Sequence, residues 1–377
     1  MSVLATEWKE VVTPVTTVPV SGEELFNEIK DFLTRYVVFS DPDAHPDAIA
    51  LWVMHTWVID CADFTPYMYI HSPVMRCGKT KVQEVVEPLV LNPLRTSNIS
   101  ESQLFREIDK SKCTLLWDET DGVFGSRKHA EANESKRSLL NAGFQRGAVA
   151  IRSKRVGNEF VSERFDPFCP KILAGIGRLP ETIIDRSISI LIHRKLKTQS
   201  CQKYRRQDRA FAVPIREKLK AWSADSQLLK ILKESNPQMP EGLNDRQEDI
   251  WEALLAIADA IGGNVPSLAR EAARSLCGNK DDDGYGPVQL AAIRKVVGQS
   301  GRIASQELID GLWKADALPS RLMEGDSPNY KKIGRWLSKF IQSYGGKPPD
   351  LMDFEGKKAR GYEASELADI FIRYCPE

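Results

Sequence analysis

A Gly-Lys-Thr triplet between an apolar strand pattern and a helix pattern is the feature that most constrains the fold of this chain. The strand pattern is Tyr67–Ile70, the triplet is Gly78-Lys79-Thr80, and the helix pattern runs from Lys81 to Glu87. Backbone N–H groups and the helix dipole favour a bound phosphate where a strand passes through such a loop into a helix. We therefore expect a phosphate-binding loop, with Lys79 at the β- and γ-phosphates of a nucleotide and the Thr80 hydroxyl on Mg²⁺.

The start of this loop departs from the usual pattern, because Pro73 occupies the position of the first glycine. Proline has no N–H and fixes φ near about −65°, so the loop is stiffer and has one donor fewer. A Gly-Lys-[Ser/Thr] triplet alone occurs by chance in roughly one chain in five of this size, so a helix start without a ligand is the alternative. The candidate nucleotide-binding residues of the loop are Pro73, Arg76, Cys77, Gly78, Lys79, Thr80 and Lys81.

A second apolar strand pattern, Thr114–Trp117, ends in two adjacent carboxylates, Asp118 and Glu119, 39 residues after Lys79. This order and separation are typical of the strand that carries the magnesium ligand in ATPases with a phosphate-binding loop. We expect Asp118 to hold Mg²⁺ together with Thr80, and Glu119 to orient and deprotonate the attacking water. A solvated turn is the alternative for an isolated Asp-Glu pair. Together with the triplet, the pair predicts ATP binding.

Arg186 lies directly before a third strand pattern, Ser187–Ile192. In an oligomer, one subunit can present such a guanidinium to the γ-phosphate bound by its neighbour and neutralise transition-state charge. We therefore expect Arg186 to act in catalysis with Lys79 and Glu119. A salt bridge with Asp185 is the alternative.

Strand patterns alternate with helix patterns up to about residue 200, which predicts a three-layer α/β core with a parallel sheet. Beyond that point the patterns are helical, and residues 278–287 are rich in turn formers. We expect four units: an N-terminal helical extension over 1–40, an ATPase core over 41–200, a helical lid over 201–282, and a winged-helix-like domain over 283–377.

Two basic segments are candidates for nucleic-acid binding. Residues 147–161 form two strand-like arms around a basic tip with Lys154 and Arg155, which predicts a hairpin that could grip a phosphate backbone. A solvated charged turn is the alternative. In the C-terminal unit, the helix pattern over 327–343 places four cations where they could share one face and meet a major groove, and a protein-binding winged helix is the alternative. These cations are Lys331, Lys332, Arg335 and Lys339.

The net charge of the whole chain does not exclude nucleic-acid binding, because the charges are unevenly distributed along the sequence. The 377 residues contain 52 Lys+Arg and 52 Asp+Glu, so the formal net charge is zero. Residues 146–209 nevertheless carry 15 Lys+Arg against 6 Asp+Glu. A ring with basic segments toward a pore and acidic outer faces would be neutral and still hold DNA.

Composition also excludes several classes of protein. No apolar run reaches the roughly 20 residues of a membrane helix, and the N-terminus has no signal-peptide pattern, so we expect a cytoplasmic protein without membrane contact. The seven cysteines are scattered and never spaced as Cys-x-x-Cys, which argues against a disulfide framework and a zinc site.

The chain resembles an uncharacterised family of P-loop ATPases found in actinobacterial and phage mobile elements. The residues that carry the resemblance are Ala48–Trp57, Ser72-Pro73 through Gly78-Lys79-Thr80, Leu115–Glu119, Leu140–Gly147, Leu173–Pro180, Asp185–Ile188, Asp245–Asp259, Gly361-Tyr362 and Arg373-Tyr374. A Ser-Pro start of the loop is usual in that family. The resemblance spans nearly the whole chain.

The family is interpreted by analogy with AAA+ and superfamily-three helicases. The analogy implies that the hairpin with Lys154 and Arg155 tracks DNA in a pore, and that Arg246 is the second-sensor arginine of the nucleotide site; a surface charge at a helix start is the alternative for Arg246. The strand end Leu173–Gly177 offers no Asn, Thr or Ser as a first sensor. This departure leaves γ-phosphate sensing unassigned.

The leading hypothesis is a ring-forming AAA+-like ATPase that hydrolyses ATP with Mg²⁺ and moves or remodels single-stranded or forked DNA for a mobile element. A primase or an initiator is a possible partner. The second hypothesis is a nucleotide-gated helicase loader, initiator or defence-system switch with little unwinding activity, which the missing first sensor favours. A structural protein with a degenerate loop is the third, and Lys79, Thr80, Asp118 and Glu119 argue against it.

Overall fold

A five-stranded parallel sheet forms the centre of the N-terminal part of the molecule, as the computed structural model shows. The structure describes residues 20–124, 133–157, 159–176, 179–277, 287–298, 301–315, 317–318, 322, 327–354 and 356–375. The strands, in sheet order, are β2 (Pro93–Thr96), β3 (Thr114–Trp117), β6 (Lys171–Ile176), β1 (Tyr67–Ser72) and β7 (Ser187–Leu191). The predicted parallel α/β core is confirmed. The edge strand β2 gave no sequence signal, because it is short, half-buried and begins with proline.

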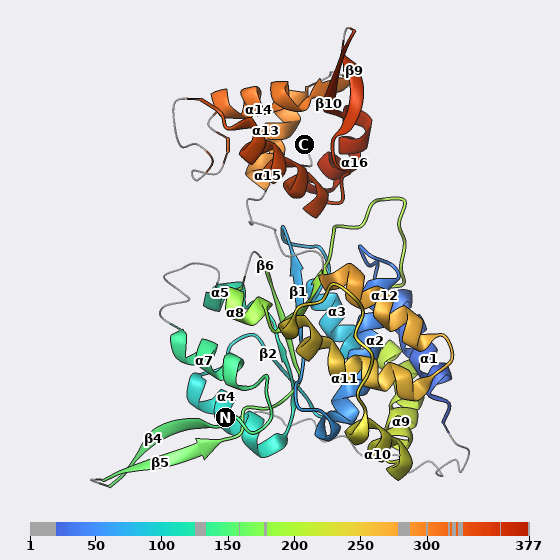
Figure 1. Ribbon diagram of the computed structural model, residues 1–377. Helices are drawn as coiled ribbons and strands as arrows, with labels where there is room; N and C mark the ends of the chain where they lie inside the picture. Colours follow the sequence, from blue (N-terminus) through green and yellow to red (C-terminus); the bar gives the residue numbers. More distant parts are fainter. Residues whose placement is uncertain are drawn as a thin grey trace.

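Helices cover both faces of this sheet (Figure 1). On one side lie α4 (Glu101–Ser111), α5 (Asp121–Phe124), α7 (Glu134–Ala142) and α8 (Glu181–Ile184). On the other side lie α1 (Gly22–Tyr36), α2 (Ala44–Trp57) with the following turn Ile59–Cys61, and α3 (Lys79–Val86). All residues of α2 from Ala44 to Thr56 are buried, as expected for a helix that is apolar on every side.

The N-terminal helix and the helical lid pack around α2. The Ser21 hydroxyl caps α1 by accepting a hydrogen bond from the Glu24 N–H, and α1 packs against α2, α3 and α9. Helices α11 and α12 pack against α2 as well. The elements of this region are the turn Arg206–Phe211, α9 (Ala212–Ser223), α10 (Ser226–Glu234), α11 (Asp245–Ile261) and α12 (Val265–Cys277). Residues 1–19 and the expected boundary near 282 lie outside the described residues.

The predicted hairpin is formed by β4 (Ala150–Val156) and β5 (Glu159–Phe165), and it projects from the body of the molecule (Figure 1). The sequence analysis placed the two basic residues at the tip of the hairpin, but the structure does not. They lie within β4, where Lys154 pairs with Val161 and Arg155 pairs with Phe160. The chain reverses after them at Gly157, whose φ of 64° is a left-handed conformation that glycine adopts without steric cost.

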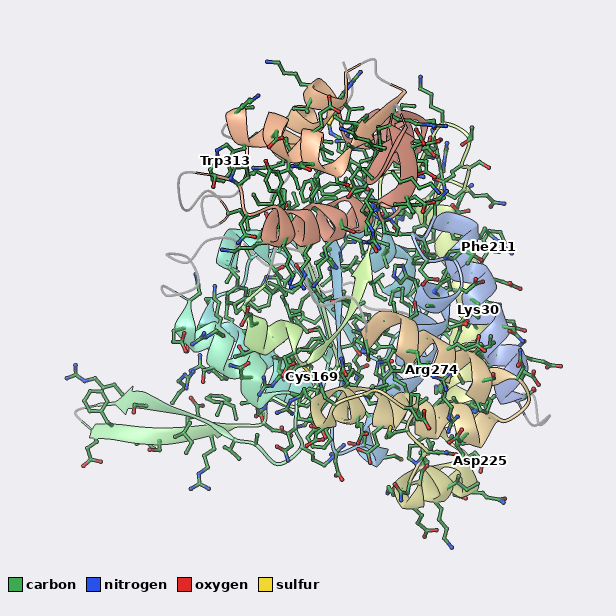
Figure 2. The ribbon with its side chains drawn as sticks, turned by 45° about the horizontal axis from the view of Figure 1, so that its top comes forward. Lys30, Cys169, Phe211, Asp225, Arg274 and Trp313 are labelled. Carbon is green, nitrogen blue, oxygen red and sulfur yellow. The ribbon has the colours of Figure 1, made fainter. Side chains whose placement is uncertain are left out.

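The buried ammonium group of Lys171 binds the chain segments on either side of the hairpin, where they enter the sheet. Lys171, at the start of β6, has no exposed surface, and its Nζ donates to the carbonyl oxygens of Cys169 at 2.8 Å, Pro167 at 3.1 Å and Gly143 at 3.3 Å. A Cβ on Gly143 would lie 2.4 Å from the Pro167 oxygen, so only glycine permits this approach. Figure 2 marks the junction at Cys169. Burial lowers the pKa of Lys171, and the three carbonyls compensate part of the lost solvation.

Within the described residues, the C-terminal domain combines the helices α13, α14, α15 and α16 with a small antiparallel sheet of strand order β8-β10-β9. Its elements are α13 (Pro287–Val297), β8 (Arg302–Ala304), α14 (Ser305–Lys314), α15 (Tyr330–Ser343), β9 (Asp350–Phe354), β10 (Lys357–Glu363) and α16 (Ala364–Tyr374). The helix expected within 327–343 is present as α15. No helix within the described ranges is both long and apolar enough to cross a membrane.

We expect Trp52→Ala in α2 to lower the free energy of unfolding by about 3 to 5 kcal/mol, because it empties a large buried site. The Trp52 side chain has 0% exposure, and its Nε1 donates to the Pro66 carbonyl at 2.8 Å. Phe211→Ala is the matched control, since Phe211 is 56% exposed, and its effect should stay below about 1 kcal/mol. Urea unfolding followed by circular dichroism measures both. Equal effects of the two substitutions would contradict the packing described for α2.

Candidate functional site

The carboxyl ends of β1 and β3 bring the two predicted magnesium ligands together. Thr80 lies in the first turn of α3, after the loop that leaves β1, and Asp118 directly follows β3. The Thr80 hydroxyl donates to the Asp118 carboxylate over 2.9 Å. A second contact fixes α3 against β3, because the buried Gln83 side chain donates through Nε2 to the Trp117 carbonyl at 3.1 Å.

The loop from Ser72 to Lys79 is curled by backbone conformations that side chains rarely adopt. Arg76 has a φ of 63° and Gly78 a φ of 104°. Successive N–H groups in such conformations can line a concavity for an anion. Pro73 contributes no N–H to it.

The Lys79 ammonium is held inside this loop. Its Nζ donates to the Ser72 hydroxyl at 2.7 Å, and Ser72 in turn donates to the Val74 carbonyl at 2.6 Å. Burial lowers the pKa of Lys79, while Cys77, Asp121 and Asp118 act in the opposite direction. Burial also raises the pKa of the Cys77 thiol, which keeps that group neutral. Of the other candidates in the loop, Arg76 is exposed and Lys81 forms an ion pair with Glu84.

Glu119 leaves the end of β3 in a strained conformation. Its φ is 58°, which is uncommon for a residue with a side chain, and its N–H donates to the Asp118 carboxylate at 3.0 Å. The Glu119 side chain is exposed. This turn separates the two carboxylates, so Asp118 points to Thr80 and Glu119 is available to solvent.

Asp121 is a member of the site that the sequence analysis missed. Its carboxylate accepts a hydrogen bond from the Ile176 N–H at 3.0 Å, at the end of β6, and it is one of the charges that raise the pKa of Lys79. The sequence at the end of β6 contains no Asn, Thr or Ser that could serve as a first sensor. The signal that could have indicated Asp121 was a third acidic residue two positions after Glu119.

The loop is also connected to the C-terminal domain through Arg194. The Arg194 guanidinium donates to the Met75 carbonyl in the loop at 3.2 and 3.3 Å and to the Arg373 carbonyl in α16 at 3.3 Å. The Arg373 guanidinium donates back to the Arg194 carbonyl. Beside them, the His193 ring and the Tyr374 hydroxyl form a hydrogen bond.

Arg186 and Arg246 lie together at the opposite edge of the sheet from the loop. Ser187 pairs with Tyr67 at the beginning of β1, whereas Lys79 follows its end. A strand of this length separates the two edges by about 20 Å. The guanidinium of Arg186 lies 5.8 Å and that of Arg246 5.3 Å from the centre of the Phe144 ring.

This placement corrects the expectation for Arg246. The second-sensor assignment requires Arg246 beside the nucleotide of its own subunit, but α11 carries it to the far edge. There it forms ion pairs with Asp249 at 2.9 Å and Asp185 at 3.8 Å. Burial lowers the pKa of Arg186, and the nearby charge of Arg246 contributes to the same shift. The Arg186 Nη1 donates to the Thr182 carbonyl at 2.6 Å.

The candidate nucleic-acid residues lie on two surfaces. On the hairpin, Arg155 is exposed, and the Phe160 side chain opposite it is 76% exposed, a feature that the sequence analysis missed. Lys154 belongs to β4, but its side chain lies outside the described part of the structure. The four cations of the C-terminal domain (Lys331, Lys332, Arg335 and Lys339) are exposed on α15.

The donors at the sheet edge fit a magnesium-bound nucleotide. Within the described ranges, no three His, Cys, Asp or Glu side chains gather into a group that could hold a metal ion. Mg²⁺ usually takes only one or two protein oxygen ligands and completes its shell with phosphate and water. The Thr80 hydroxyl and the Asp118 carboxylate are such a pair.

Comparison with known sequences finds one family and one relative. The family described as "Protein of unknown function (DUF3631)" matches residues 191–374. An "Uncharacterized 28.9 kDa protein in xis 5'region" of Saccharopolyspora erythraea is 30% identical over 191 residues, which are 49% of this chain and 69% of the relative.

Comparison with solved structures finds only distant similarity. The apo C-terminal region of NrS-1 is 14% identical over 94% of this chain and 77% of that one, with a TM-score of 0.30. The JCV helicase is 11% identical over 73% and 65% of the two chains, with a TM-score of 0.28. A structure of Drosophila ORC bound to DNA is 10% identical over 99% and 97%, with a TM-score of 0.24. At these values, function has to be argued from the site.

Two glycines near the site should respond to alanine with opposite signs. Gly78→Ala forces a side chain into a φ of 104°, so we expect a loss of about 1 kcal/mol in the free energy of unfolding. Gly122, in α5, has nothing within 4 Å of an added Cβ, and Gly122→Ala should raise that free energy by about 0.5 kcal/mol. Urea unfolding measures both changes. If both substitutions changed the free energy of unfolding in the same direction, the left-handed conformation of Gly78 would be contradicted.

Proposed function

The chain belongs to the DUF3631 family of proteins of unknown function, and we propose that it is an oligomeric ATPase that uses Mg²⁺ and acts on DNA as a helicase or remodelling motor. The observation that carries the proposal is the hydrogen bond between Thr80 and Asp118 at the carboxyl edge of the sheet, beside the half-buried Lys79. A hydroxyl, a carboxylate and an ammonium group meet there from two strands that are far apart in sequence.

The residues of the loop have separate tasks in this proposal. Lys79 exchanges its bond to Ser72 for the β- and γ-phosphate oxygens, and the N–H groups of the curled loop bind the same phosphates. The Thr80 hydroxyl and the Asp118 carboxylate would hold Mg²⁺. Bound Mg²⁺ would neutralise charge that develops on the phosphates during hydrolysis.

The water-activating group in the proposal is Glu119. Its side chain is exposed, whereas the Asp118 carboxylate accepts from Thr80. Asp118 could therefore ligate the metal while Glu119 accepts a proton from water. The Asp121 carboxylate accepts a hydrogen bond from the Ile176 N–H at the end of β6. This bond positions the turn that follows Glu119 against β6. Asp121 therefore fixes the end of β6, where the sequence offers no first-sensor side chain, and γ-phosphate sensing stays unassigned.

A ring is proposed because Arg186 cannot serve the loop of its own subunit. It lies at the opposite edge of the sheet, and its buried Nε has no hydrogen-bond partner in the described structure. A neighbouring subunit that docks its loop against this edge would receive the Arg186 guanidinium at its γ-phosphate. Arg246 shares the same edge, so we assign it to the subunit interface as well.

Two surfaces support an action on DNA. The projecting hairpin combines Arg155 with the exposed Phe160. Cations bind the phosphates of a single strand, and aromatic rings stack on its bases. In the C-terminal domain, the element order α13-β8-α14-α15-β9-β10 supports our proposal of a winged-helix-like domain, and α15 carries four exposed cations that could contact DNA phosphates. A primase or an initiator of the mobile element remains our proposed protein partner.

A nucleotide-gated loader or switch is the second candidate. The hydrogen bonds that join the loop to α16 through Arg194 favour it, because they connect the nucleotide site directly to the C-terminal domain. ATP turnover with and without single-stranded or duplex DNA, together with strand displacement on a forked substrate, separates the candidates. DNA-stimulated turnover with displacement supports the motor, and tight DNA binding without either supports the loader.

We expect Lys79→Ala to abolish ATP turnover, since it removes the cation from the phosphate site. The matched control is Lys220→Ala, an exposed cation in the last turn of α9, and turnover should change less than about twofold. Steady-state phosphate release measures both variants. Full activity of Lys79→Ala would refute the ATPase assignment.

Arg186→Ala should also abolish turnover, but by an effect on the neighbouring subunit. A mixture of Arg186→Ala and Lys79→Ala subunits should regain activity, because a Lys79 loop can then meet an intact Arg186 across an interface. Phosphate release by the single variants and by their mixture is the measurement. An inactive mixture, with mixed oligomers demonstrated by differential tags, would contradict a role across the interface.

A further inference from the structure

The C-terminal domain contains a groove of about 940 Å³ between helix α15 and the strand β10. This volume is at the upper end of the range for ligand pockets in proteins. None of the described residues that line the groove is acidic. Its cations come from both elements and are Lys331, Lys332, Arg335 and Lys339 of α15 and Arg360 of β10.

An indole ring lies among these cations. Trp336 lines the groove and is half-buried. It stacks on the buried Phe340 with a centroid distance of 4.9 Å and an interplanar angle of 23°, so its orientation is held by packing. Pro348 and Pro349 add apolar surface to the lining. The groove thus combines positive charge with a fixed aromatic surface.

This combination favours a single strand over a duplex. A recognition helix reads a duplex by protruding into its major groove, whereas here the cations of α15 surround a hollow that contains the aromatic ring. Bases of a duplex are stacked on each other and cannot reach such a ring. Bases of a single strand are free to stack on it while their phosphates contact the surrounding cations.

We propose that this groove binds single-stranded DNA, with a base against Trp336 and phosphates at Arg335 and the neighbouring cations. The proposal rests on the action on DNA proposed above, and it specifies the strand form and a binding site separate from the hairpin. The C-terminal domain then holds an unpaired strand, and does not read a duplex sequence.

The test is fluorescence anisotropy of an oligothymidylate of about 12 nucleotides with the full chain in the absence of ATP. Trp336→Leu should weaken binding about tenfold, and Trp336→Phe should retain most of the affinity because it preserves an aromatic ring. Arg335→Ala should lower the slope of log K against log salt by about 0.7, the value for one phosphate contact on a single strand. Lys314→Ala, an exposed cation of α14 in the same domain, is the matched control and should change neither quantity.

Crosslinking locates the strand directly. An oligonucleotide with 5-iododeoxyuridine, irradiated on the complex and analysed by mass spectrometry, should attach to the peptide that contains Trp336. Crosslinks confined to residues 150–165, with wild-type binding by the Trp336 and Arg335 variants, would overturn the groove and leave the proposed motor intact. Equal losses of affinity for a duplex of the same length would overturn the choice of a single strand.

The outcomes for the two proposals differ. If the groove variants behave as expected while wild-type protein releases no phosphate from ATP, the ATPase fails and the groove stands. If the chain binds no DNA in either form, the groove is overturned together with the DNA part of the proposed function.

Discussion

The hydrogen bond between Thr80 and Asp118 depends on the parallel direction of the central strands, and the candidate site depends on it in turn. In a parallel sheet the carboxyl ends of β1 and β3 reach the same edge, although 41 residues (73–113) separate the strands in sequence. The intervening strand β6 ends between them and is tied to the site by Asp121. Burial of the strands on both faces keeps their register, so the polar groups at their ends meet with little freedom.

The same edge connects to the C-terminal domain. Arg194 follows β7 and donates to carbonyl oxygens of the loop and of α16, while Arg373 donates back to the Arg194 carbonyl. The contact is made by backbone carbonyls and guanidinium groups, so it depends on the positions of both chain segments. The phosphate-binding candidate and the basic groove on α15 are therefore parts of one connected structure.

The distribution of charge explains how a neutral chain can present basic surfaces. Its 52 cations and 52 anions cancel in total, but the lining of the groove on α15 contains five cations and, among described residues, no acid. The projecting hairpin exposes Arg155 beside Phe160. Net charge describes the average of a surface, and binding depends on where the charges are placed.

Local patterns in the sequence determined the elements and the residues of the loop, because capping, apolar periodicity and the Gly-Lys-Thr triplet act over short distances. The cap of α1 at Ser21, the strands that begin at Tyr67 and Thr114 and the arms of the hairpin follow from such signals. Only the tertiary structure decided which residues share a site. Packing of α11 carried Arg246 to the edge with Arg186, and the end of β6 brought Asp121 to Lys79. These positions depend on how helices and strands pack across long separations in sequence, which no local pattern records.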